Sequence, residues 1–237
     1  MIEPISAVAP ELEGTASAGQ RWTKATFLHW RIESSVVAPL LPAGVRPDEH
    51  DGSSWVGLIA FYLDRATLLG SPPVPYFGEF TEINVRLYGV DERGRRGVVS
   101  LETSRLAAVL AARAAFSIPY FWSRTSLAEH DGVVDYRAVR HVGEGASHIV
   151  ARPGTEVVSG DATADFLTAR WALFTTRGGR TVYLRNHHEP WPLVAARLEL
   201  LEDTLLERAG IPGLTDRAPD SVLYSAGVTT WFGRSRA

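Results

Sequence analysis

The stretch Thr81–Tyr88 reads TEINVRLY, and polar and apolar side chains alternate along its whole length. This period of two predicts a β-strand, because successive side chains of a strand point to opposite faces of the sheet. The apolar side chains then share one face, whereas Glu82, Asn84 and Arg86 share the other at steps of about 6–7 Å. The segment therefore predicts a strand with one apolar and one polar face.

Strand-like segments flank this one. The turn at 91–94 (DERG) leads from it to a strand at 97–101, and the residues RGGR at 177–180 connect strands at 172–176 and 181–184. Each pair is predicted to form an antiparallel hairpin. Further strands are predicted at 24–30, 55–63, 118–124, 133–141, 147–151, 193–200 and 222–231.

Few segments have helical character. Helices are predicted at 104–115 with Ser104 as N-cap, after Asp161 or Thr163, within 36–41, and at 202–209 before Gly210. Many strands with a few scattered helices predict a mainly β (α+β) domain. The antiparallel hairpins favour a curved antiparallel β-barrel or cone with a few peripheral helices.

The composition restricts both the domain organisation and the partners. The 237 residues are 45% hydrophobic and 22% charged, with a net charge of −3 and no cysteine. A sizeable core can form, disulfides and thiolate metal sites are excluded, and no excess of positive charge suggests nucleic acid as a partner. Residues 1–20 lack periodicity and are predicted to be a flexible tail before a single domain at 21–237.

Nothing in the sequence indicates a membrane segment. The N-terminal residues MIEPISAVAPELEG carry acids and no basic region, so they do not resemble a secretory signal. The longest apolar run, 106–112, is far shorter than the ~18 residues of a spanning helix. We therefore expect a cytoplasmic protein with no membrane partner.

The polar face of the strand at 81–88 has two interpretations. On a solvent-exposed sheet, Glu82, Asn84 and Arg86 are ordinary surface residues. Inside a closed barrel they form a polar row in a cavity, where the pKa of a carboxylate is tunable and an arginine can bind a carboxylate substrate. The pattern alone leaves both open.

Two further motifs invite a functional interpretation. The residues NHHEPW at 186–191 suggest a metal site, but adjacent side chains of a strand point to opposite faces, so His187 and His188 cannot easily share one ion. We expect no metal, and a structural or pocket-lining role for His188. The residues IPYFW at 118–122, preceded by Arg113, fit either a core strand or an aromatic pocket wall.

Taken in order and spacing, short segments from 21 to 231 resemble the DUF2071 (YqjF-like) family of the acetoacetate-decarboxylase-like superfamily. The matching segments are FLHW at 27–30, LLPAG at 40–44, WVG at 55–57, FTEINVRLY at 80–88, GVVSLE at 97–102, AR at 112–113, IPYF at 118–121, HHEPW at 187–191 and YSAGV at 224–228. The resemblance implies a cone-like, strongly curved barrel with peripheral helices and an internal cavity.

The resemblance also assigns roles and exposes a departure. Glu82 matches a glutamate of the decarboxylase active site. The decarboxylases' Schiff-base lysine follows a proline in the strand after the helix, and here Pro119 is followed by Tyr120. The one lysine of the chain, Lys24, lies far away in sequence. Because imine chemistry needs an amine, we do not expect a functional acetoacetate decarboxylase.

Three functions remain in view. The first is a non-covalent enzyme, with Glu82 as general acid or base, Tyr120 as hydrogen-bond donor, and Arg86 or Arg113 as anion clamp. Isomerisation, cyclisation, dehydration or an imine-free lyase step on a small keto or carboxylate metabolite would suit this set. The second is a non-catalytic ligand-binding or sensory barrel, and the third a partner-binding domain with a vestigial cavity. The other expected pocket residues are Asn84, His29, Trp122 and His188. No cofactor is expected, and a homo-oligomer is left open.

Overall fold

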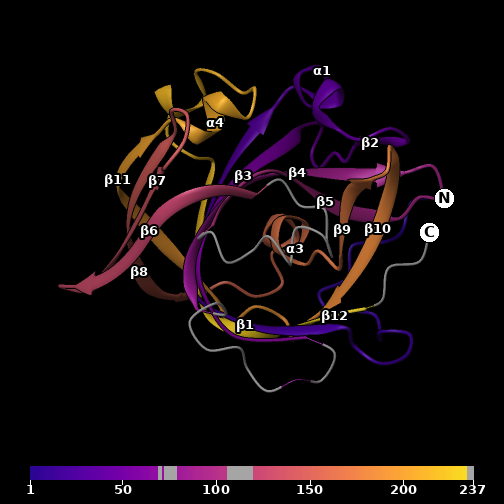
Figure 1. The fold of residues 1–237 in the computed structure, drawn as a ribbon, viewed down its shortest axis with the longest axis horizontal. Helices are drawn as coiled ribbons and strands as arrows, with labels where there is room; N and C mark the ends of the chain where they lie inside the picture. The colour runs from indigo at the N-terminus through magenta and orange to yellow at the C-terminus, as the bar shows by residue number, and fades with distance from the viewer. Residues whose placement is uncertain (69–70, 72–78, 106–119, 234–237) are drawn as a thin grey trace.

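The computed structural model describes residues 1–68, 71, 79–105 and 120–233, except for the side chains of Leu68, Ser104, Arg105 and Tyr120. Strands dominate, and the mainly β architecture is confirmed (Figure 1). The strands are β1 (Ala18–Ile32), β2 (Val45–Pro47), β3 (Ser54–Leu68), β4 (Phe80–Asp91), β5 (Arg96–Arg105), β6 (Tyr120–His130), β7 (Val133–Arg140), β8 (Ala146–Val157), β9 (Ala172–Arg177), β10 (Arg180–His187), β11 (Leu193–Asp203) and β12 (Ser221–Phe232).

The helical segments are short. They are α1 (Ser34–Val37), η1 (Ala38–Leu40), α3 (Ala162–Thr168), α4 (Leu205–Arg208) and η3 (Leu214–Asp216). Asp161 caps α3, since its carboxylate accepts a hydrogen bond from the Ala164 amide at 2.7 Å. The helix predicted at 202–209 is only one turn, because β11 continues to Asp203. The helix predicted at 104–115 falls almost wholly outside the described residues.

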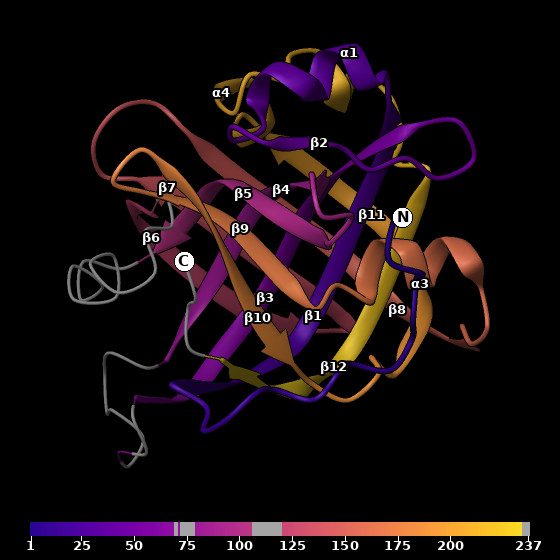
Figure 2. The ribbon, with the colours of Figure 1, turned by 90° about the vertical axis from the view of Figure 1, so that its right-hand side faces the viewer.

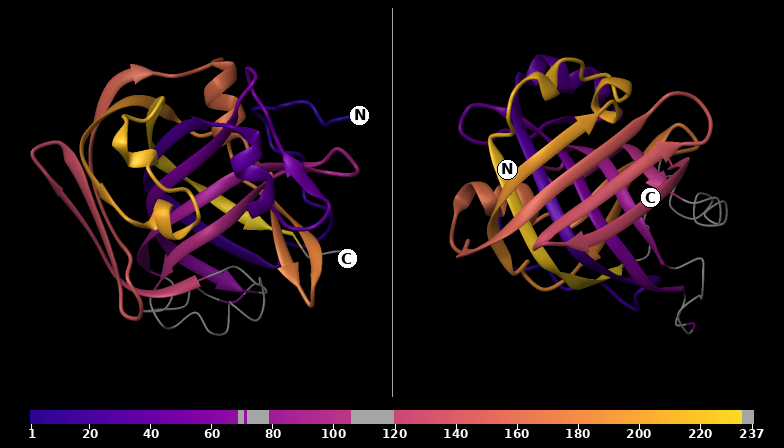
Figure 3. Two further views of the ribbon diagram at one scale, coloured as in Figure 1. Left: turned by 90° about the horizontal axis from the view of Figure 1, so that it is seen from above. Right: turned by 90° about the vertical axis from the view of Figure 1, so that its left-hand side faces the viewer.

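The strands of the described chain close into two rings that share β12, β1, β3, β4 and β5. In the first ring, β9 and β10 connect β5 back to β12; in the second, β6, β7, β8 and β11 do so (Figures 1 and 3). The pairs β5–β6 and β5–β9 are parallel rather than antiparallel. Parallel neighbours need a long crossover connection, and α3 lies in the crossover that leads to β9.

Both faces of the shared strands are therefore covered. The apolar face of β4, with Ile83, Val85 and Leu87, packs in the large core beneath β7 and β8. The opposite face looks into the first ring, where α3 fills one end (Figures 1 and 2). Phe166 of α3 packs there against Tyr88. This double coverage explains why the polar row of β4 is removed from solvent.

The N-terminal segment, expected to be flexible, is hydrogen-bonded to the rings. The Glu3 amide donates to Gly94 at 2.8 Å, and the Trp171 indole donates to the Ser6 carbonyl at 2.9 Å. Strand β1 begins at Ala18, inside the range expected for the tail. The segment lacks apolar periodicity, but its backbone polar groups find partners on the strands. None of the helices in the described part of the chain has the length and apolar character needed to cross a membrane.

Candidate functional site

The first ring encloses a cavity of about 120 Å³ next to the C-terminal end of α3. Side chains from β1, β3, β4, β5, β9, β10 and β12 line it. Its polar residues are Gln20, Glu82, Asn84, Arg86, Ser100, Thr168, Arg170, Asn186 and His188. Its aromatic residues are Trp22, Phe27, Phe61, Trp191 and Phe232. The cavity thus has a charged wall and an aromatic wall.

A larger cleft of about 730 Å³ lies between the N-terminal segment and the β9–β10 hairpin. Two of its charged side chains are already paired: Arg95 forms an ion pair with Asp91 at 2.6 Å and stacks on Tyr183 at 4.1 Å. The inner cavity is the better candidate, because charged groups buried there act in a low dielectric.

Glu82 and Asn84 lie side by side on the charged wall. They are only 7% and 9% exposed, and the Asn84 Nδ2 donates a hydrogen bond to the Glu82 Oε1 at 3.2 Å. The Asn84 Oδ1 is buried without a partner. The alternation of β4 places both residues and Arg86 on this wall, as the inward-facing interpretation of the sequence requires.

The end of α3 and Tyr88 hold the Arg86 side chain. The Nε of Arg86 donates to the Tyr88 hydroxyl at 3.1 Å, and Nη2 donates to the Leu167 carbonyl at 2.9 Å. The last turn of a helix presents carbonyl groups and a negative dipole end, which favours a guanidinium there. Arg86 forms no ion pair with any carboxylate of the described chain. Its charge remains available to a ligand.

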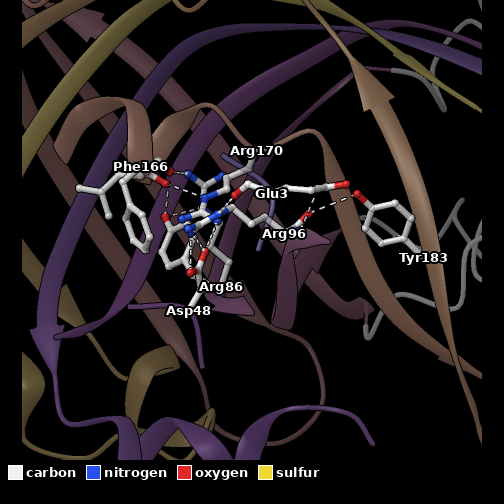
Figure 4. A network of polar contacts seen from close by, with 9 residues as sticks. Glu3, Asp48, Arg86, Arg96, Phe166, Arg170 and Tyr183 are labelled. Carbon is white, nitrogen blue, oxygen red and sulfur yellow. Dashed lines mark hydrogen bonds and ion pairs between the residues drawn. The ribbon is translucent and has the colours of Figure 1, made fainter. Parts of the chain in front are cut away.

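Arg170 is a second arginine of this wall that sequence reasoning missed. Its Nε donates to the Phe166 carbonyl at 2.6 Å, and its Nη1 forms an ion pair with Asp48 at 2.6 Å (Figure 4). Its Nη2 is buried without a partner. Burial lowers the pKa of Arg170 and Asp48 opposes that shift, so the guanidinium stays charged at neutral pH.

The Asp48 carboxylate forms ion pairs with two guanidinium groups, those of Arg170 and Arg96. Asp48 also accepts from Arg96 at 2.5 Å, and Arg96 donates to the Glu3 carbonyl at 2.7 Å (Figure 4). The chain of contacts therefore runs from the N-terminal segment to the cavity wall.

His188 is a neutral member of the site. Its Nδ1 lies 2.6 Å from the Glu189 carbonyl, and a carbonyl can only accept, so Nδ1 carries the proton and Nε2 presents a lone pair. Burial lowers the pKa of His188 to about 4, with the Glu189 carbonyl opposing the shift. The ring is 2% exposed and lies 4.6 Å from Trp171 and 5.1 Å from Trp191, measured between ring centres.

His29, expected to line the pocket, lies behind its wall. It is fully buried, and its Nε2 is 2.6 Å from the Tyr88 hydroxyl. Burial, together with Arg86 and Arg170, lowers the pKa of His29 well below its usual value. The same Tyr88 hydroxyl accepts from Arg86, and the His29 ring stacks on Phe27 of the cavity wall, so His29 contacts the site through these two residues.

The remaining sequence candidates do not gather in the described cavity. Trp122 is 53% exposed and contacts His141 on the outside of β6, which belongs to the second ring. The alternation of β6 turns this side chain outward, so its expected place in the pocket was wrong. The backbone of Tyr120 pairs with Thr103, whereas its side chain and the whole of Arg113 lie outside the described residues. Among the residues described, no group of three or more histidines and carboxylates could hold a metal ion.

Comparison with solved structures places the fold. Acetoacetate decarboxylase from Legionella pneumophila subsp. pneumophila str. Philadelphia 1 matches with a TM-score of 0.66 and 13% identity over 97% of this chain and 92% of that one. An acetoacetate decarboxylase-like enzyme from Sphingomonas wittichii RW1 matches with a TM-score of 0.62 and 16% identity, covering 94% and 92%. The enduracididine biosynthesis enzyme MppR, complexed with pyruvate, matches with a TM-score of 0.61 and 12% identity, covering 94% and 90%.

Sequence comparison places the family. The uncharacterized protein YqjF of Bacillus subtilis (strain 168) is 31% identical over 201 residues, which are 81% of each chain. The model of DUF2071, an uncharacterized conserved protein family, matches residues 19–229. The chain belongs to the DUF2071 family, on the curved β fold that it shares with acetoacetate decarboxylase-like enzymes.

Proposed function

We propose that this protein is an enzyme that performs non-covalent acid–base chemistry on a small keto or carboxylate metabolite. The observation that carries the proposal is the placement of Glu82 in one buried cavity with two guanidinium groups, those of Arg86 and Arg170. A carboxylate beside fixed positive charge, away from bulk water, is the arrangement that proton transfer next to a carbonyl requires. The similarity to MppR, whose structure holds pyruvate, supports a 2-keto acid as the first substrate to test.

Each group has a defined part in the proposed step. The Glu82 carboxylate removes a proton from the carbon next to the substrate carbonyl, and the electron pair of that C–H bond moves into the enolate. Arg86 and Arg170 bind the substrate carboxylate and stabilise the added negative charge. Tyr120 is proposed, from the sequence alone, to donate to the enolate oxygen. Return of the proton to the same or another carbon gives exchange or isomerisation.

An imine intermediate has no place in this proposal. Lys24, the one lysine of the chain, does not line the cavity and forms an ion pair with Glu129 on β6. The nucleophilic amine that imine chemistry needs is therefore not supplied by the residues that form the described cavity.

The test is hydrogen–deuterium exchange at the carbon next to the carbonyl of pyruvate and related 2-keto acids in D₂O, followed by NMR. We expect the protein to accelerate exchange, and Glu82→Gln to slow it by about 10²–10⁴-fold while the melting temperature stays close to that of the parent. Glu199→Gln is the control, because Glu199 pairs with Arg152 on the outer face of β11. No acceleration with any 2-keto acid would contradict this chemistry.

The alternative function is a ligand-binding barrel without turnover. The aromatic wall, in which Trp22 lies 5.4 Å from Phe61 and 6.1 Å from Trp191, is the feature that favours it. Saturable binding of a carboxylate without exchange, with Glu82→Gln changing affinity by at most about 1–3 kcal/mol, would support this alternative.

A further inference from the structure

We propose, on the basis that the inner cavity is the functional site proposed above, that it recognises a monocyclic aromatic acid, such as a 2-keto acid with an aromatic ring, that carries a hydroxyl or amino group on its ring. Three independent features of the cavity lead to the three parts of this ligand: its negative charge, its flat ring and its hydrogen-bond donor.

The two arginines of the charged wall predict that the ligand carries a negative charge. Arg170 is 4% exposed, and its Nη2 is buried without a partner although the residue lines the cavity. Its counter-ion Asp48 is shared with Arg96, and Arg86 has no carboxylate partner in the described chain. Buried guanidinium groups are stable only when their charge and N–H groups are satisfied. A ligand carboxylate, which accepts two N–H groups at once, completes this wall.

The aromatic wall opposite the arginines predicts that the ligand contains a flat ring. Trp22 and Trp191 lie nearly parallel at 12°, and Trp191 meets Phe27 edge-on at 5.1 Å. Flat aromatic surfaces favour a flat apolar ligand group through offset or edge-on contacts. The volume of about 120 Å³ limits the ligand to a single ring, since benzene alone occupies a cavity of ~150 Å³.

Hydrogen-bond acceptors of the cavity that lack partners predict a hydrogen-bond donor on the ligand. The Asn84 Oδ1 and the Asn186 Oδ1 are buried without hydrogen bonds, and the His188 Nε2 presents a lone pair because Nδ1 is the protonated atom. A ligand with only a carboxylate leaves both amide oxygens unsatisfied. A hydroxyl or amino group on the ring supplies the missing donor.

The experiment measures binding of small probes to the full chain by calorimetry and by quenching of tryptophan fluorescence. Benzoate should bind at least about tenfold more tightly than benzamide, which lacks the charge, and than acetate, which lacks the ring. Cyclohexanecarboxylate, which has the charge but not the flat ring, should bind more weakly than benzoate. At least one of the 2-, 3- and 4-hydroxybenzoates or aminobenzoates should bind about 2–10-fold more tightly than benzoate, the gain expected of one added hydrogen bond.

A matched pair of variants tests the site. Arg86→Met should reduce the preference for benzoate over benzamide, because Arg170 alone then faces the carboxylate. Arg95→Met should retain it, because Arg95 also lies over an aromatic ring but outside the cavity. If Arg86→Met fails to fold, Trp191→Leu serves instead, and it should remove the preference of benzoate over acetate.

Three results would overturn the inference: benzamide or benzylamine binding as well as benzoate, no benzoate binding at millimolar concentration, or no gain from any ring substituent. These outcomes are separable from the proposed function. If the exchange of 2-keto acids depends on Glu82 but benzoate does not inhibit it, the proposed ligand class is wrong and the proposed chemistry stands. If benzoate binds in a way that depends on Arg86 but no exchange occurs, the proposed chemistry is wrong and the ligand class stands.

Discussion

Lys24 shows how one residue separates this chain from imine chemistry. It has a backbone φ of +51°, in an irregular part of β1 where the pairing with β3 shifts between Thr23 and Thr26. Its carbonyl accepts from the Tyr136 hydroxyl, and its ammonium pairs with Glu129. The side chain is 36% exposed, so the amine keeps its water and its counter-ion rather than lying in an apolar pocket.

We therefore predict that borohydride will not trap acetoacetate or a related ketone on this protein. Imine formation needs an amine placed to attack the ketone, whereas the Lys24 amine is ion-paired with Glu129 and does not line the cavity. Peptide mapping by mass spectrometry after reduction is the measurement. Modification at the α-amine of Met1 is the nonspecific background, whereas a reduced imine at Lys24 would restore the decarboxylase mechanism.

Individual site residues differ in how far the sequence could predict them. The period of two in β4 places Glu82, Asn84 and Arg86 on one face, and only the question of whether that face is buried needed the structure. His188 lies in a motif rich in polar and aromatic residues, which is itself a signal of a pocket. Arg170 follows a short helix with no periodic pattern, and it reaches the cavity because Asp48 and the end of α3 bind it. Such long-range partners leave no local trace in the sequence.

At the scale of elements, β1 and β12 depend on one close approach. Gly227 on β12 pairs with Thr23 and has a φ of +134°. A Cβ atom there would lie 2.2 Å from the Trp22 carbonyl oxygen and 2.7 Å from the Thr23 Cα. Both are backbone atoms, which cannot turn aside as a side chain can.

Gly227→Ala should consequently lower the free energy of unfolding by about 2–4 kcal/mol, from backbone strain and overpacking together. Denaturant unfolding measures the change. Gly143→Ala is the matched control: its φ is +76° but nothing lies within 4 Å of the added carbon, so it should cost only about 1 kcal/mol. Equal losses in the two variants would show that the close approach does not matter.

For the whole molecule, the sequence predicted a closed, curved, mainly β sheet but not the way the sheet closes. Hairpins such as β9–β10 follow from local turns. The two rings depend instead on pairings such as Asn186 with Phe232 and Val98 with Leu173, which join distant parts of the chain. Because both rings use β4, its two faces are both buried, and a pattern that is typical of a solvent-exposed sheet lines an internal cavity.

The N-terminal segment tests how far stability depends on such distant contacts. Its backbone carbonyls accept from Arg96, Trp171 and His187, and Trp171 in turn lies against His188 at the cavity. Deleting residues 2–12 removes these acceptors. At about 0.5–1.5 kcal/mol for each of the three hydrogen bonds, and about 2–4 °C for each kcal/mol in a chain of this size, the melting temperature should fall by about 3–18 °C. Scanning calorimetry of the truncated chain is the measurement.

Ser6→Ala is the control, because the Ser6 side chain bonds only to Val8 while its carbonyl stays available to Trp171. A truncated chain that melts within about 1–2 °C of the parent would mean that these hydrogen bonds are exchanged for water at no cost, and that the segment is the dispensable tail its composition suggests.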